Sequence, residues 1–174
     1  MLNIRTADIA DYEDVRDFYY DMTDELEHAE YSPQWKKDEF PTQEYLLGAI
    51  KNNELYIGEI DGRIASCMVI NHEYSEGYRN VNWSVEASDK ELLIVHLLGV
   101  RSAYSGQGIA RQMIGKIIDF ARENGIKAIR LDVIEENVPA AAVYTKLGFK
   151  YIETIKLYYE DTGWTDFKMF EYII

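Results

Sequence analysis

The sequence has little of what several classes of protein depend on. A single cysteine, Cys67, excludes an internal disulfide framework and is typical of a reducing cytoplasm. With only three histidines besides, we expect no structural zinc site and no metal cofactor. No apolar run approaches the roughly 18–20 residues of a membrane helix, and the N-terminus lacks the apolar core of a signal peptide. We therefore expect a cytoplasmic protein with no membrane partner.

Positive charge is also scarce, and it is unevenly distributed. The chain has 18 basic and 31 acidic residues, a net charge of −13 that argues against a nucleic-acid partner. Residues 1–60 carry 15 acidic and five basic side chains, whereas residues 101–130 carry two acidic and six basic ones. The basic segment is suited to a small anionic ligand, and the acidic segment either attracts a cationic ligand or is simply a solvated face.

The 174 residues, 47% of them apolar, predict a single α/β domain over residues 1–174. Hydrophobic periodicity predicts the order β-α-α-β-β-β-α-β-α-β-β, with a strand–helix–strand unit in the middle that is expected to be parallel. The expected helices run from Asp8 to about His28, from Thr42 to Lys51, over 109–124, and from Pro139 to about Leu147. The expected strands are 3–6, 54–60, 63–71, 92–100, 128–133, 151–159 and 165–173. Residues 72–90 are expected to be polar and irregular, with a strand at Trp83 and Val85 as the alternative.

The segment richest in chemical signal lies between the buried strand 92–100 and the amphipathic helix that begins at Ile109. Gly106 and Gly108, one residue apart, allow the backbone to turn tightly and to approach a ligand closely. The helix start that follows offers free N–H groups and a positive dipole end, which together suit phosphate oxygens. A plain strand-to-helix turn explains the glycines equally well.

Two other phosphate-binding patterns fit poorly. The dinucleotide-binding fingerprint requires a third glycine at the position that Arg111 occupies here. The Gly-Lys-Ser/Thr phosphate loop is absent from the sequence.

The same segment resembles the acyl-CoA signature of the GNAT superfamily of N-acyltransferases, Gln/Arg-x-x-Gly-x-Gly/Ala. Gly108 and Ala110 match that pattern, while Ser105 replaces the usual Gln or Arg. A later motif, Asn137 with Ala140, Tyr144 and Gly148-Phe149, is similar to that of the same family. The similarity is strongest over residues 92–150.

The resemblance implies the mixed α/β GNAT fold and acetyl-CoA, or a related acyl-CoA, as the cofactor. It implies that pyrophosphate oxygens rest on main-chain N–H groups from Gln107 to Arg111. A bulge near Gly99 would let the strand pair with pantetheine, and an N–H near Leu98 or Gly99 would stabilise the oxyanion. The implied cofactor-binding residues are Leu98, Gly99, Val100, Ser105, Gly106, Gln107, Gly108, Ile109, Ala110, Arg111, Asn137, Ala140 and Tyr144.

The candidate catalytic residues are Tyr144 and His96. The family's matching tyrosine often acts as the general acid that protonates the leaving thiolate, and Tyr144 takes that role by resemblance. His96, the polar exception in an apolar strand, is either a base for the incoming amine or a core histidine. Tyr31, Trp35 and Trp83 either line the acceptor site, where a cation would lie over ring faces, or pack in the core.

The resemblance implies an N-acetyltransferase that acts on a primary amine of a small molecule or peptide. An acyl-CoA-binding module without catalysis keeps the glycine loop and is the second interpretation, and a nucleotide-binding α/β domain is the third. The aromatic C-terminal strands either form the edge of a homodimer or finish the sheet.

Overall fold

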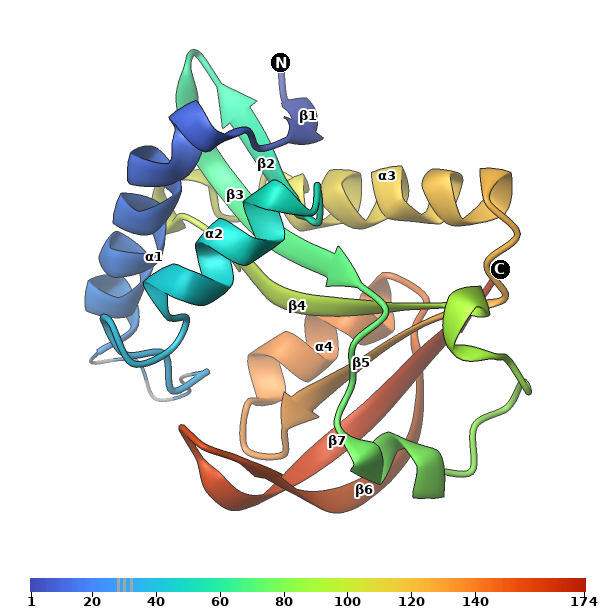
Figure 1. The fold of residues 1–174 in the computed structure, drawn as a ribbon. Helices are drawn as coiled ribbons and strands as arrows, with labels where there is room; N and C mark the ends of the chain where they lie inside the picture. Colours follow the sequence, from blue (N-terminus) through green and yellow to red (C-terminus); the bar gives the residue numbers. More distant parts are fainter. Residues whose placement is uncertain (28, 30, 32) are drawn as a thin grey trace. The chain divides into compact units, whose positions relative to one another are not determined.

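The structure, a computed structural model, describes residues 1–27, 29, 31 and 33–174. Its helices are α1 (Tyr12–Leu26), α2 (Gln43–Lys51), α3 (Ile109–Glu123) and α4 (Val138–Lys146). Its strands are β1 (Asn3–Thr6), β2 (Leu55–Ile60), β3 (Arg63–Asn71), β4 (Leu92–Val100), β5 (Ala128–Ile134), β6 (Lys150–Tyr159) and β7 (Gly163–Ile173). In one mixed sheet the strands follow the order β1-β2-β3-β4-β5-β7-β6 (Figure 1). The expected mixed α/β class and order of elements are confirmed.

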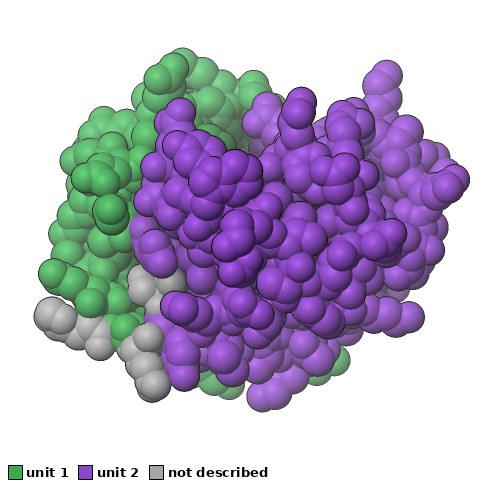
Figure 2. Space-filling model, turned by 90° about the horizontal axis from the view of Figure 1, so that it is seen from below, with its two compact units in different colours: residues 1–30, 35–70, 96–116 green, residues 31–34, 71–95, 117–174 purple. Residues whose placement is uncertain are grey.

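The chain divides into two compact units, which Figure 2 shows in different colours. Unit 1 comprises residues 1–30, 35–70 and 96–116, and unit 2 comprises residues 31–34, 71–95 and 117–174. The first four residues of β4 belong to unit 2 and the remaining five to unit 1. Both units therefore contain a part of β4, the strand that precedes the glycine loop.

Unit 1 combines the antiparallel strands β1, β2 and β3 with helices α1 and α2. The turn Asp61-Gly62 joins β2 to β3, as the sequence predicts. Helices α1 and α2 lie side by side (Figure 1), and their apolar faces share one core with the strands. Its most buried large side chains are Phe18, Tyr19, Leu46, Leu55 and Ile57.

Unit 2 is organised by β5, which has a parallel neighbour on one side and an antiparallel neighbour on the other. The parallel ladder joins Leu92–Ile94 of β4 to Ala128–Arg130, and both strands continue beyond it. On the other side β5 pairs with β7, which pairs in turn with β6. Buried residues of this core include Tyr78, Ile94, Leu157, Phe167 and Met169.

The irregular character expected of residues 72–90 is confirmed, and Trp83 and Val85 do not lie on a strand. Residues 81–88 are irregular and lie between two short 3₁₀ helices, η2 (Glu76–Asn80) and η3 (Asp89–Glu91). Side chains rather than a neighbouring strand bind their backbone: the N–H of Ser84 donates to Glu171 Oε2 at 2.9 Å. Buried backbone groups need a partner, and here polar side chains provide it.

The first helix begins later than the sequence indicates. Asp8 caps a 3₁₀ turn, η1 (Ile9–Asp11), by accepting the N–H of Ala10 at 2.8 Å, and α1 starts at Tyr12. The expected end at His28 lies outside the described residues. Of the helices in the described ranges, none has the length and apolarity needed to cross a membrane.

Candidate active site

The second half of β4 is distorted in unit 1. Leu97 has φ of 55°, an uncommon conformation for a leucine that costs on the order of 1–3 kcal/mol. The buried hydroxyl of Tyr19 donates to the carbonyl of Leu97 at 2.9 Å, and Ser66 Oγ donates to the carbonyl of Gly99 at 2.7 Å. A bulge was expected near Gly99, and the left-handed residue is Leu97, two positions earlier in β4. Side chains from α1 and β3 therefore bind the backbone carbonyls on either side of this distortion.

Aromatic rings pack against Gly99. A Cβ added there would lie 3.3 Å from Trp35 Cη2 and 3.4 Å from two ring atoms of Phe18. Tyr19 contacts both rings edge to face, with centroids 5.1 Å from Phe18 and 5.4 Å from Trp35. Trp35, expected at an acceptor site, therefore lies directly on the distorted strand.

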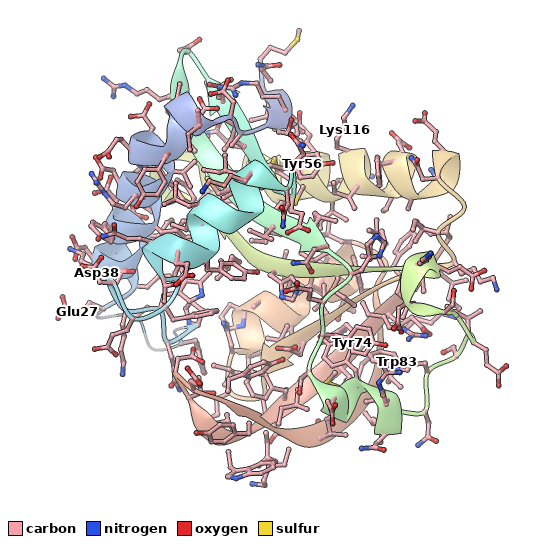
Figure 3. The ribbon with its side chains drawn as sticks, in the orientation of Figure 1. Glu27, Asp38, Tyr56, Tyr74, Trp83 and Lys116 are labelled. Carbon is pink, nitrogen blue, oxygen red and sulfur yellow. The ribbon has the colours of Figure 1, made fainter. Side chains whose placement is uncertain are left out.

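The loop that follows β4 is exposed from Ser105 to Gly108. Gly106 and Gly108 have φ of 75° and 72°, in the left-handed region that favours glycine. A Cβ at either position would meet nothing within 4 Å, so the space beside the loop is open. The N–H of Gln112 donates to the carbonyl of Gly108, and the N–H groups of the turn before it have no acceptor within the helix. Lys116 adds exposed positive charge farther along α3 (Figure 3).

Acidic residues of α1 anchor the start of this loop. Arg101 pairs with Asp21 at 2.6 Å, donates through Nε to the carbonyl of Ile64, and lies 5.2 Å from the Phe18 ring centroid. The N–H of Ser102 donates to Glu25 Oε2 at 3.0 Å. Part of the acidic surface is therefore structural rather than merely solvated.

A surface hollow of about 370 Å³ adjoins this anchor in unit 1. Carboxylates of α1 and two guanidinium groups share its wall, so its charge is mixed. It is lined by Asp14, Asp17, Asp21, Gly62, Arg63, Ile64, Arg101, Ala103 and Tyr104.

Tyr144 lies on α4 in unit 2. Its ring packs against Phe149 and Phe170, with centroids 5.6 Å and 6.4 Å away. Burial raises the pKa of Tyr144 well above its ordinary value of 10, and the negative charge of Asp132 raises it further. The phenol is therefore held in its protonated form, the form that can donate a proton.

Asp132 on β5 is a residue that the sequence analysis missed. Its Oδ2 accepts hydrogen bonds from the hydroxyls of Tyr78 at 2.7 Å and Tyr159 at 2.9 Å. Burial, and then Asp132, raise the pKa values of both tyrosines. The only sign of Asp132 in the sequence was a carboxylate among the apolar residues of an expected strand.

The remaining predicted residues lie as follows. Asn137 caps α4 by accepting the N–H of Ala140 at 3.2 Å. His96 is half-buried in β4, and Tyr31 is exposed. Trp83, which Figure 3 labels, contacts Tyr78. The Arg130 guanidinium lies 4.3 Å from the centroid of the Trp83 ring. Among the described residues, no group of three or more His, Cys, Asp or Glu side chains is placed to hold a metal ion.

A family model and the similar proteins with known names indicate the same family. The sequence model of the Acetyltransferase (GNAT) family matches residues 20–149. N-alpha-acetyltransferase RimI of Mycobacterium tuberculosis is 38% identical over 69 residues, which are 40% of this chain and 42% of that protein. The matches to curated relatives thus span less than half of those proteins' own length.

Solved structures match over nearly the whole chain. A GNAT-family acetyltransferase from Streptococcus agalactiae has a TM-score of 0.82 at 21% identity, covering 99% of this chain and 95% of that one. Arabidopsis thaliana NAA60 in complex with acetyl-CoA has a TM-score of 0.70 at 18% identity, covering all of both chains. At these identities the similarity shows the fold alone.

Proposed function

Because the chain belongs to the GNAT acetyltransferase family, we propose that it transfers an acetyl group from acetyl-CoA to a primary amine of a small molecule or peptide. Residues 1–174 act as one N-acetyltransferase domain in this proposal. The observation that carries it is the open, left-handed glycine pair that leads from the distorted β4 directly into α3.

The glycine loop binds the pyrophosphate of the cofactor. Main-chain N–H groups from Gln107 to Arg111 are the donors, and the dipole of α3 favours the negative charge. The open space beside Gly106 and Gly108 supports this role, because it lets phosphate oxygens approach the backbone. Ser105 supplies a hydroxyl where the family usually has a longer side chain. Asn137 and Ala140, at the start of α4, are the proposed contacts of the pantetheine.

The end of β4 binds the acyl-bearing arm. Beyond its ladder with β5, the backbone at Leu98, Gly99 and Val100 pairs with the extended pantetheine as a strand would. A main-chain N–H at Leu98 or Gly99 polarises the thioester carbonyl. One such donor is worth about 2.7–4 kcal/mol in the transition state.

The reaction is direct attack by the amine. The amine nitrogen forms a bond to the thioester carbon, the carbon–sulfur bond breaks, and the sulfur leaves as a thiolate that takes a proton from Tyr144. The nitrogen loses a second proton as the amide forms, and this proton returns to the Tyr144 phenolate through water. The amine must first lose its own proton, and His96, directly or through water, is the base that we assign. The phenol of Tyr144 carries its proton at neutral pH, as the acid role requires, and burial raises its pKa further above that range.

The acceptor is a cation until it is deprotonated, which fits an acidic protein that attracts amines by charge. Tyr31, Trp35 and Trp83 are the proposed aromatic contacts of the acceptor. In this proposal the protein binds neither nucleic acid nor membranes, and it acts in the cytoplasm. The aromatic strands β6 and β7 are the proposed edge of a homodimer.

Gly108→Ala is expected to weaken the binding of coenzyme A at least tenfold. An alanine at φ of 72° costs on the order of 1–2 kcal/mol, so the loop leaves the geometry that directs its N–H groups at phosphate. Isothermal titration calorimetry with coenzyme A measures the change. Gly115→Ala on α3 is the matched control, because its Cβ also meets nothing within 4 Å and its backbone is helical.

The same calorimetry tests the proposal itself. Heat of binding with coenzyme A supports it, and a folded chain that gives no heat with coenzyme A contradicts it. Thiol release from acetyl-CoA across a panel of amines separates an enzyme from a non-catalytic acyl-CoA-binding module. Binding of NAD in place of coenzyme A would favour a nucleotide-binding domain.

A further inference from the structure

Three aromatic side chains, Phe18, Tyr19 and Trp35, pack together against the distorted end of β4. We call this group the aromatic wall. Phe18 and Tyr19 are buried, whereas Trp35 is only half-buried and keeps part of its ring exposed. Atoms of Trp35 and Phe18 lie 3.3–3.4 Å from the position that a Cβ of Gly99 would take. A carbon atom on this face of Gly99 would therefore be in tight contact with the two rings, which would have to shift by a few tenths of an ångström.

The segment that carries Trp35 is held in place by polar contacts. The backbones of Lys36 and Phe40 exchange two hydrogen bonds of 2.9 Å, which closes the turn after Trp35. Asp38 accepts hydrogen bonds from Tyr20 and Gln43, tying that turn to α1 and α2. Figure 3 labels Asp38 at this position beside the helices. The turn that follows Trp35 is thus bound to both helices, and the Trp35 ring itself packs against Tyr19.

We propose that Trp35 limits the transferred acyl group to acetyl. This inference rests on the proposed function, in which the thioester carbonyl lies at the N–H groups of Leu98 and Gly99. An acyl chain that extends from this point toward the closed face of Gly99 meets the Trp35 ring. A two-carbon acyl group ends before the wall, whereas propionyl and butyryl groups must displace a ring held against buried neighbours.

The expected discrimination follows from the size of the groups. One methylene group that a pocket cannot accommodate changes affinity or rate by about 10–200-fold. The native chain should therefore bind acetyl-CoA at least tenfold more tightly than butyryl-CoA. Trp35→Ala removes the ring from Gly99 and should reduce this ratio to roughly threefold or less, by opening space for the longer chain.

Calorimetric titration with coenzyme A, acetyl-CoA, propionyl-CoA and butyryl-CoA tests the proposal without a known acceptor. Free coenzyme A gives the reference affinity of each variant. The measured quantity is the affinity for acetyl-CoA divided by the affinity for butyryl-CoA. Trp35→Phe keeps a smaller ring and should give an intermediate ratio, which answers the same question if Trp35→Ala does not fold. Trp164→Ala, at a tryptophan that is 70% exposed on β7, is the matched control and should leave the ratio unchanged.

The outcomes separate the two proposals. An unchanged ratio in both Trp35 variants, or a native chain that binds butyryl-CoA as tightly as acetyl-CoA, overturns the role of Trp35 and leaves the proposed function standing. A folded native chain that binds none of the four compounds overturns the proposed function, and the acyl-size role falls with it.

Discussion

We expect Tyr144→Phe to lower the turnover of acetyl transfer at least tenfold while the fold stays intact. The substitution removes only the hydroxyl, so the ring keeps its contacts with Phe149 and Phe170. A general acid typically contributes 10²–10⁴-fold, and water replaces part of that contribution when the acid is lost. Initial-rate measurements of thiol release with a productive amine give the change, and a thermal melt reports on the fold.

The pH dependence gives a second readout of the same role. Burial and Asp132 raise the pKa of Tyr144 above 10, so the acid stays protonated throughout the neutral range. Loss of the hydroxyl should therefore lower the rate by a similar factor from pH 6 to pH 9. The pH–rate profile of Tyr144→Phe should show no new apparent pKa in this range. Tyr158→Phe, at an exposed tyrosine on β6, is the control. Unchanged turnover in Tyr144→Phe would remove the tyrosine from the mechanism.

The sequence alone was sufficient for the segment from β4 to α3, because its signals are local. A continuous apolar run, a glycine pair and an amphipathic period each depend on neighbouring residues. The left-handed conformations at Gly106 and Gly108 follow from the same local chemistry. The family resemblance rested on this segment together with the later motif from Asn137 to Phe149, and the family is confirmed.

The sequence indicated a distortion near the end of β4 but not the residue that adopts it. A bulge was expected near Gly99, and the left-handed conformation belongs to Leu97. A hydroxyl 78 residues earlier in the chain, on Tyr19, binds the Leu97 carbonyl. The position depends on tertiary contacts that override local preference.

Asp132 was missed for a related reason. Its two hydrogen-bonding tyrosines lie 54 and 27 residues away in sequence, on η2 and on β6. A single carboxylate in an apolar strand does not indicate such partners, and the same strand carries Arg130. Only the fold distinguishes the partners of these two charged residues.

Glu171→Gln is expected to destabilise unit 2 by roughly 3–5 kcal/mol, because it leaves a buried guanidinium without its counter-ion. Glu171 and Arg130 face each other across β7 and β5, with side chains only 1% and 6% exposed. The Arg130 guanidinium binds Glu171 Oε1 through Nη2 at 2.9 Å and Nε at 3.0 Å. Glutamine keeps the size of the side chain, so the loss reports on charge rather than on a cavity.

The pair also holds the irregular segment 81–88 on the sheet. Arg130 donates to the carbonyl of Val85 at 2.7 Å, and Glu171 accepts the N–H of Ser84 at 2.9 Å. Hydrogen exchange of the amides in this segment should therefore accelerate in Glu171→Gln, beyond what the global loss of stability explains.

Urea denaturation measures the stability change, and an exposed ion pair provides the control. Asp119 pairs with Arg122 at 3.3 Å on α3, where both side chains are more than half exposed. Asp119→Asn should cost at most about 1 kcal/mol, because water replaces the partner. If Glu171→Gln also lowered the free energy of unfolding by no more than about 1 kcal/mol, other groups would be stabilising the buried charge of Arg130. The Glu171–Arg130 pair would then not be what holds segment 81–88 against β5 and β7.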